Sequence, residues 1–352
     1  TQGAGGGALL IRHNPRLISI PDRWGVSTSP VHDFFKPRRE VSIKSVISHV
    51  VQLARETGAS IKEGMVDRMV RHLPESTVRR MGIFSHGIDS VQVHRDEPVF
   101  DGQFSNQCYQ DAVEEAFRDF RSKAESDGRW DAEGGTVLTE DWARIIMHLP
   151  YAFQAKRMFP AVFAYERRGS ASWTDVEAEI GLPPSIEDFD DTPEGQAEHG
   201  KAMDGYRRSI SKTQAYREFH AERIEKGQRA SSLIGNQYTG SIFLAMMSTF
   251  ESDYESDSPL DDQQFGLCGY GSGAKAKVFE GIVSDRWREV VASWNLFERM
   301  AGRMAIDQVT YELLHKGIHD GSVLKPRGEF ALVDIEGGEG VLEGARTYAW
   351  VE

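Results

Sequence analysis

One histidine of this chain stands where an apolar run ends. His148 follows Ile145–Met147 and precedes Leu149 and Pro150. Because Pro150 lacks a backbone N–H and disfavours helical geometry at the residue before it, we expect His148 at the end of a strand, with a new element beginning near Ala152. An imidazole held there could act as a general acid or base, since its ordinary pKa lies near neutrality. The alternative is a histidine of the hydrophobic core, which is the commoner role for a lone histidine on an apolar segment.

A second segment, residues 231–241, places polar side chains between an apolar run and a helical pattern. It contains Asn236 and Tyr238, and the helical pattern begins at Ile242. The amide of Asn236 could therefore orient a carbonyl group at a helix terminus.

A third segment, residues 265–273, runs from an apolar strand into a glycine-rich turn. Ser272 lies between Gly271 and Gly273. Missing side chains let backbone N–H groups and the Ser272 hydroxyl approach an anion or a thioester oxygen. The same composition is also typical of a tight hairpin, which is the alternative interpretation.

The elements that must position these residues form a mixed α/β pattern, because short apolar runs alternate with longer amphipathic stretches. Strands are expected at residues 8–12, 17–20, 144–147, 265–270 and 276–283. Helices are expected at residues 107–123, 206–226, 285–300 and 307–315, with Ser105 as the N-cap of the first.

Composition limits the classes of function. The 352 residues include 41 Lys and Arg against 54 Asp and Glu, a formal net charge of −13, which opposes non-specific binding to nucleic acid. Two cysteines give no disulfide framework, and no apolar run is long enough to cross a bilayer. We therefore expect a cytoplasmic protein without nucleic-acid or membrane partners.

In their order and spacing, these segments resemble the carboxyl-terminal half of 3-hydroxy-3-methylglutaryl-CoA synthase, an enzyme with the layered α/β/α fold of thiolases. Residues 1–15, TQGAGGGALLIRHNP, are similar to the family's central strand and its turn. Residues 32–37, HDFFKP, and 98–105, PVFDGQFS, are similar to two further family segments. The tail segments VTYELL at 309–314 and RTYAW at 346–350 complete the resemblance.

The resemblance implies a condensation. In the family, a cysteine carries an acetyl group, a glutamate deprotonates its methyl group, and the carbanion attacks the ketone of acetoacetyl-CoA. His148 matches the histidine that hydrogen-bonds this acceptor and assists proton transfer to its ketone oxygen. Asn236 matches the asparagine that orients the acceptor. Ser272, with Gly271 and Gly273, matches the turn that lines the reacting thioester.

Further substrate contacts follow from the same resemblance. Asp33 matches an active-site aspartate, while Phe34 and Tyr151 are expected in the pocket walls; Tyr238 is a further predicted contact. Lys156 and Arg157 are candidates for the coenzyme A phosphates, although basic residues on a helix often form only a solvated face. Neither a metal ion nor a cofactor is implied, because coenzyme A thioesters are the substrates.

The chain departs from the family pattern in two ways. The family's nucleophilic cysteine and its glutamate base have no counterpart here. Cys108 falls on an amphipathic helical pattern and Cys268 in an apolar run, so both are interpreted as packing residues. The second departure is an insertion in which apolar residues at helical spacing predict two helices, around residues 43–51 and 61–73. Packing on the parent fold and docking on a partner chain are both open for these helices.

Three segments are expected: residues 1–37 as the end of the first thiolase-like half and a linker, 38–97 as the helical insertion, and 98–352 as the carboxyl-terminal half. The favoured hypothesis is one subunit of a split synthase. An amino-terminal half would supply Cys and Glu, in a hetero-oligomer built on a thiolase-like dimer. A carrier-protein-dependent condensing enzyme of a specialised pathway and a non-catalytic binding or scaffold subunit are the alternatives.

Overall fold

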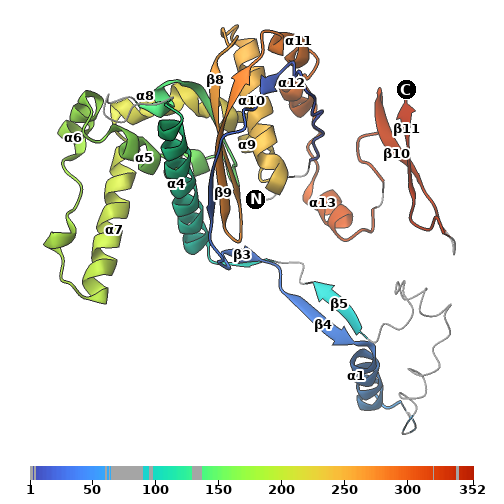
Figure 1. Ribbon diagram of the computed structural model, residues 1–352. Helices are drawn as coiled ribbons and strands as arrows, with labels where there is room; N and C mark the ends of the chain where they lie inside the picture. The colour runs from blue at the N-terminus through green and yellow to red at the C-terminus, as the bar shows by residue number, and fades with distance from the viewer. Residues whose placement is uncertain are drawn as a thin grey trace. The chain divides into compact units, whose positions relative to one another are not determined.

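A five-stranded mixed sheet lies at the centre of the first part of the chain in this computed structural model (Figure 1). The structure describes residues 3, 5–59, 62, 64, 90–94, 98–128, 137–319, 321–337 and 341–352. It divides into two units, residues 1–294 and 295–352, which are described separately.

The order of the strands puts β9 in the middle of this sheet. On one side, β9 pairs antiparallel with β8, and β8 pairs parallel with β7. On its other side, β9 pairs antiparallel with both β1 and β2, along different parts of its length. Because β7 and β8 are parallel, their carboxyl ends meet at one edge of the sheet, where His148 follows β7. The strands are β1 (Ile18–Ser19), β2 (Trp24–Thr28), β7 (Trp142–Met147), β8 (Gln264–Gly271) and β9 (Lys275–Val283).

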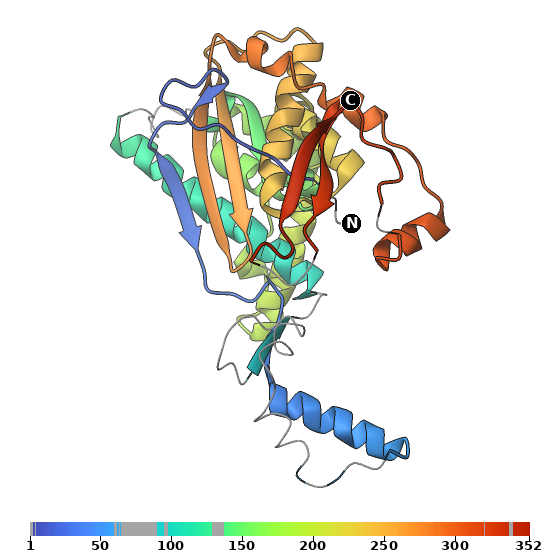
Figure 2. The ribbon, with the colours of Figure 1, turned by 90° about the vertical axis from the view of Figure 1, so that its right-hand side faces the viewer.

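Helices cover both faces of the sheet (Figures 1 and 2). The long helix α4 (Gly102–Ser126) packs on one face, where the rings of Phe117 and Phe120 contact Trp142 at 5.8 and 6.1 Å between centroids. On the other face, Phe250 of α10 (Ser241–Glu255) packs against Phe265 at 5.1 Å. The core therefore has a helix, sheet, helix arrangement. The other helices of this unit are α5 (Gln154–Arg167), α6 (Thr174–Ile180), α7 (Pro193–Ile210), α8 (Gln214–Arg223), α9 (Glu225–Ile234) and α11 (Trp287–Val291).

Two glycines permit this close packing. A Cβ atom at Gly25 of β2 would lie 2.0 Å from the carbonyl oxygen of Ala116, so a side chain there would push α4 off the sheet. A Cβ atom at Gly266 would lie 2.1 Å from the ring of Trp142. Neither distance leaves room for another residue without backbone movement.

Several sequence predictions are confirmed, and others are wrong in their boundaries. β7 ends at Met147 and α5 begins at Gln154, so His148 does lie between a strand and a new element. The predicted cap of α4 is wrong. Asp101, not Ser105, is the N-cap, because its carboxylate accepts the N–H groups of Gln103 and Phe104 at 2.8 and 3.0 Å.

Two predicted helices are interrupted. The stretch 206–226 divides between α7, α8 and α9. The break before α8 falls where the Thr213 hydroxyl caps a new helix by accepting the N–H of Tyr216, and α9 begins after Ile224 without a side-chain cap. The stretch 285–300 breaks at Asn295, whose left-handed φ of 51° ends regular helix before α12 (Leu296–Ala301).

The strand predicted at residues 8–12 is not formed. This segment is irregular in the structure and has no strand partner among the described residues, so the side chains of Leu10 and Ile11 are 84% and 93% exposed. A strand needs a neighbour to satisfy its backbone hydrogen bonds, and apolar composition alone does not supply one.

The inserted region contains a helix where one was predicted. β4 (Arg38–Ser42) pairs antiparallel with β5 (Ser90–His94), and α1 (Ile43–Glu56) follows β4 with Ser42 as its N-cap. The second helix predicted there, around residues 61–73, lies almost wholly outside the described residues. A short pairing of β3 (Phe34–Phe35) with β6 (Val99–Phe100) brings together the chain on either side of the insertion.

The second unit contains α12, the predicted helix α13 (Gln308–His315) and an antiparallel pair of strands. The strands are β10 (Glu329–Ile335) and β11 (Arg346–Val351), with Phe330 opposite Trp350. No helix in the described part of the chain combines the length and the apolar character that crossing a bilayer requires.

Candidate active site

The backbone of His148 is fixed from two sides. Its N–H donates to the carbonyl of Cys268 on β8 at 2.9 Å, and its carbonyl accepts the hydroxyl of Tyr109 on α4 at 2.8 Å. The ring itself is partly buried and makes no hydrogen bond within the described residues. Burial lowers the pKa of His148 to about 4, so the imidazole is neutral at pH 7. This value is lower than the near-neutral pKa that the sequence suggests.

A neutral imidazole at this position favours one kind of chemistry. Each tautomer presents one N–H donor and one acceptor nitrogen. With its N–H it can stabilise negative charge on a carbonyl oxygen without first taking up a proton. The geometry thus suits hydrogen bonding to a ketone better than abstraction of a proton from solvent.

Asp33 ties the glycine-rich turn to the rest of the site. Its fully buried carboxylate accepts the hydroxyl of Tyr270 at 2.6 Å and the backbone N–H of Gly273 at 2.8 Å. The N–H of Val31 donates to the carbonyl of Gly273 at 2.7 Å. Burial, the acceptor Asp33 and its charge all raise the pKa of Tyr270, so its hydroxyl stays protonated. These contacts use the Asp33 oxygens inside the protein, which gives this residue a positioning role in the structure.

The glycine-rich turn is a tight hairpin between β8 and β9. The alternative interpretation of its composition predicted this hairpin. Gly271 pairs with Lys275, and residues 272–274 close the loop. Gly273 has a φ of 124°, which side chains rarely allow. Ser272 is exposed at the tip. The hairpin geometry leaves its hydroxyl accessible to a ligand.

Phe34 and Tyr238 come together from distant parts of the sequence. Their ring centroids lie 6.2 Å apart, and Phe34 also contacts Phe100 at 5.6 Å. Tyr238 has a left-handed φ of 51°, an unfavourable conformation for a residue with a side chain. Such strain often marks a functional segment, and it is consistent with the prediction for this loop.

Asn236 is oriented by its own loop. Its side-chain oxygen accepts the N–H of Tyr238 at 2.8 Å and the hydroxyl of Ser241 at 3.0 Å, while its backbone carbonyl accepts the N–H of Gly3 at 2.7 Å. The side-chain NH₂ has no partner among the described residues. Asn236 therefore presents two fixed donors, which is the requirement for orienting a carbonyl group.

Two basic residues of α5, Lys156 and Arg157, were predicted to bind phosphates. No contact among the described residues joins them to His148 or Asn236. Arg157 lies over the ring of Tyr151, with its Nη1 atom 3.5 Å from the Tyr151 hydroxyl, and Lys156 is exposed. Both basic residues lie in the first turn of α5, where the helix dipole also favours anions. Gln154 at the same terminus has a buried side-chain oxygen without a partner in the described part of the chain.

The structure thus links most of the predicted residues through contacts. The ring of Tyr270 lies 6.5 Å from that of His148, Tyr270 binds Asp33, and the neighbouring Phe34 reaches Tyr238 in the loop of Asn236. Tyr109 and Tyr270 were not among the predicted site residues. Tyr270 directly precedes the glycine-rich turn at Gly271–Gly273. Tyr109 lies on a helix face whose apolar spacing is typical of core residues.

Neither cysteine has the environment of a nucleophile. Burial raises the pKa of Cys268 to about 12. Burial and the charges of Asp33 and Asp111 raise the pKa of Cys108. Among the described residues there is also no group of three or more side chains that could hold a metal ion. Two surface hollows near the carboxyl end of α4, around residues 21–24 and 262–264, contain none of the candidate residues.

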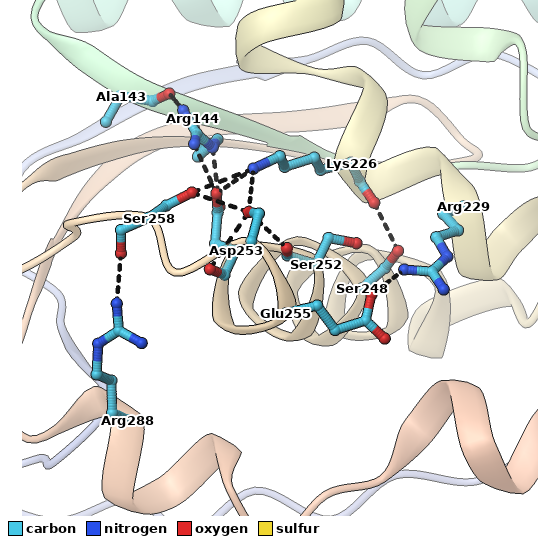
Figure 3. Close-up of polar contacts among 11 residues, drawn as sticks. Ala143, Arg144, Lys226, Arg229, Ser248, Ser252, Asp253, Glu255, Ser258 and Arg288 are labelled. Carbon is cyan, nitrogen blue, oxygen red and sulfur yellow. Dashed lines mark hydrogen bonds and ion pairs between the residues drawn. The ribbon is translucent and has the colours of Figure 1, made fainter.

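At the other end of β7, buried charge is fully paired (Figure 3). Asp253 of α10 is fully buried and accepts Nε and Nη2 of Arg144 at 2.8 and 2.6 Å, together with Nζ of Lys226. Burial acts to raise the pKa of Asp253, but hydrogen bonds from Arg144 and Lys226 outweigh it, and the pKa lies below its usual value. This cluster joins β7, α9 and α10.

Comparison with solved structures identifies the class of fold. The structure superposes on MvaS in complex with 3-hydroxy-3-methylglutaryl coenzyme A with a TM-score of 0.58, at 22% identity, over 96% of this chain and 59% of that one. It also superposes on the HMG synthase of the curacin biosynthetic pathway in complex with an acetyl donor-ACP, with a TM-score of 0.53 at 14% identity, over 96% of this chain and 58% of that one. The fold is the thiolase-like mixed α/β fold of these synthases.

The sequence identifies the family. Residues 92–318 match the family described as hydroxymethylglutaryl-coenzyme A synthase C terminal, and the chain belongs to this family. The hydroxymethylglutaryl-CoA synthase of Haloferax volcanii is 24% identical over 336 residues, covering 94% of this chain and 60% of the relative. A synthase of Aspergillus fumigatus is 25% identical over 222 residues, covering 62% of this chain and 45% of the relative. The chain thus spans about 60% of the length of the Haloferax relative.

Proposed function

We propose that this chain supplies the acceptor side of a hydroxymethylglutaryl-CoA synthase-like condensing enzyme. His148, Asn236 and Ser272 act on the acceptor thioester, and a partner amino-terminal half provides the cysteine nucleophile and the glutamate base. The three predicted segments, 1–37, 38–97 and 98–352, are part of this proposal. The observation that carries it is the neutral His148 ring, held in place by its backbone but without a side-chain hydrogen bond in the described residues.

The proposed reaction divides the work between the two halves. The partner's glutamate removes a proton from the methyl group of the acetyl-cysteine, and the resulting carbanion forms a C–C bond to the ketone carbon of the acceptor. The N–H of His148 stabilises the alkoxide, which takes up the proton that the glutamate removed. Water then cleaves the thioester to the cysteine, which restores the thiol.

The remaining groups hold the acceptor. The free NH₂ of Asn236 binds an acyl carbonyl, and the exposed Ser272 lies against the thioester. Tyr238, Phe34 and Tyr151 form the apolar walls. Lys156 and Arg157, at the amino terminus of α5, bind the phosphates of coenzyme A.

The acceptor thioester is carried on coenzyme A or on a carrier protein. Acetoacetyl-CoA is the acceptor that the family match favours. The curacin-pathway synthase binds an acetyl donor-ACP, so a carrier protein brings the donor thioester to a similar synthase, and a carrier protein is our second candidate for the acceptor as well. A competition for the assembled enzyme between acetoacetyl-CoA and the corresponding carrier-protein thioester distinguishes them by the ratio of kcat/KM values.

The division of labour is tested by mapping acetylation. The chain alone, incubated with acetyl-CoA and analysed by peptide mass spectrometry, should carry no acetyl thioester at Cys108 or Cys268, because both thiols have raised pKa values. Native mass spectrometry of the purified complex should reveal a partner chain, and the acetyl group should map to a cysteine of that partner. Stable acetylation of Cys108 or Cys268 would contradict the proposal.

A further inference from the structure

Three buried tyrosines of this chain donate their hydroxyl groups to backbone carbonyls. Tyr109 donates to His148 at 2.8 Å, Tyr216 to Lys156 at 3.2 Å, and Tyr206 to Gly181 at 3.1 Å. Lys156 is proposed to bind only the phosphates of coenzyme A, and Gly181 has no proposed role, whereas the acceptor of Tyr109 belongs to the residue proposed to act on the reacting ketone. This difference separates an ordinary packing tyrosine from one that can control a site.

The ring of Tyr109 also lies within the site. Its centroid is 4.5 Å from that of Tyr270, in an edge-to-face arrangement, and 6.4 Å from that of His148. Tyr270 in turn binds Asp33, which holds the N–H of Gly273. One side chain of α4 therefore contacts both the histidine at the end of β7 and the aromatic ring that leads to the glycine turn.

The hydroxyl of Tyr109 provides a hydrogen-bond donor for the backbone carbonyl of His148. The regular pairing of β7 with β8 ends at Met147, and the N–H of His148 makes one further bond to the carbonyl of Cys268. The carbonyl of His148 lies beyond the sheet, and Tyr109, only 1% exposed, supplies its donor. Without that donor the carbonyl would turn toward water, and the imidazole would move with it.

We propose that Tyr109 is a positioning residue for His148, which couples the orientation of the imidazole to the glycine turn held by Asp33. It acts through its hydroxyl on the His148 carbonyl and through its ring on Tyr270, and it does not touch the substrate. This inference rests on the proposed function for its effect on condensation, but its effect on the His148 ring is independent of any activity.

The tyrosines and cysteines near His148 do not interfere with a measurement of its pKa. From α4 these are Tyr109 and Cys108, and from β8 they are Tyr270 and Cys268. Burial is the largest cause of a raised pKa in all four, so they remain neutral below pH 8. Asp33, the carboxylate of this group, is already occupied by Tyr270 and Gly273. A change in the titration of His148 on substituting Tyr109 therefore reports a change in its burial.

The test compares Tyr109→Phe with Tyr216→Phe in the full chain. Both tyrosines are buried and both variants lose one hydroxyl-to-carbonyl bond, so their melting temperatures should fall to a similar extent. NMR of the imidazole should show the pKa of His148 rising from about 4 toward its ordinary value of 6.5 in Tyr109→Phe only. In the assembled enzyme, kcat for condensation should fall about tenfold in Tyr109→Phe, with a smaller change in KM for the acceptor and none in acetylation.

The two readouts separate the failure of this inference from the failure of the proposed function. An unchanged His148 titration in Tyr109→Phe would overturn the inference, whatever the activity. The same shift in Tyr216→Phe would also overturn it, because the effect would then be one of general loosening. A shift confined to Tyr109→Phe in a protein without condensing activity would support the positioning role and contradict the proposed function.

Discussion

The two ends of β7 hold polar side chains in opposite situations. At its start, the carboxylate of Asp253 accepts hydrogen bonds from Arg144 and Lys226, and its charge is fully paired (Figure 3). At its end, the His148 ring has no hydrogen-bond partner in the described residues and is kept neutral by burial. A buried charge with its partners stabilises the packing of three elements. A partly buried imidazole without a partner has its donor and its acceptor available for a ligand.

The largest effect is expected at the start of the strand. Asp253→Ala would leave Arg144 and Lys226 close together without their counter-charge, which typically costs about 3–5 kcal/mol for a buried pair. Urea denaturation should show this loss in the free energy of unfolding. Asp257→Asn is the control, because that carboxylate binds Arg288 but is 92% exposed, and because asparagine tolerates the left-handed φ of 52° at this position; it should change stability far less. Equal losses in the two variants would remove the contrast between the ends of β7.

The pH dependence of the free energy of unfolding tests the burial of His148, at the carboxyl end of β7. His148 has a pKa of about 4 in the folded protein and an ordinary value near 6.5 when unfolded. The unfolded chain therefore binds more protons between these pH values, and stability is lost as the pH falls from 6.5 to 4. The difference amounts to about 3 kcal/mol. His148→Gln should lose correspondingly less stability than the wild type over this range. Parallel curves for His148→Gln and the wild type would show that burial does not control the imidazole.

A smaller effect is expected at the start of α4, the helix that carries Tyr109 to the site. Asp101→Ala removes the side chain that accepts the N–H groups of Gln103 and Phe104, and loss of such a cap costs about 1 kcal/mol. Ser105→Ala should have little effect, because Ser105 lies inside the first turn. Chemical denaturation of both variants distinguishes the cap in the structure from the one that the sequence suggested. A larger loss for Ser105→Ala would restore the sequence-based assignment.

The sequence was most informative where local chemistry dictates local structure. Pro150 ends the extended segment after His148, and glycine composition predicts the hairpin at residues 271–275. Helix boundaries were less predictable because several neighbouring residues could cap the same helix. Asp101 and Ser105 are both good caps by type, and the extended backbone of Asp101 decides between them.

The rest depends on contacts between distant residues. Tyr109 has the spacing of a core residue, and nothing in the sequence indicates that its hydroxyl binds a carbonyl 39 positions further along the chain. Asp33 was predicted as a substrate contact, but its bonds to Tyr270 and Gly273 cross more than 230 residues. The roles of His148, Asn236 and Ser272 on the substrate remain predictions. They can be tested by mutation.

The most direct test of the acceptor-side role is His148→Ala in the assembled enzyme, with the two half-reactions measured separately. Acetylation of the partner's cysteine should stay nearly unchanged, while condensation with the acceptor should fall by about 10²–10³-fold, the usual cost of losing one hydrogen-bond donor to a developing oxyanion. Asn236→Ala should lower condensation in the same way and also weaken acceptor binding, because its amide orients the acceptor. A block in acetylation with condensation spared from preformed acetyl-enzyme, or no change in either step, would contradict the role assigned to His148.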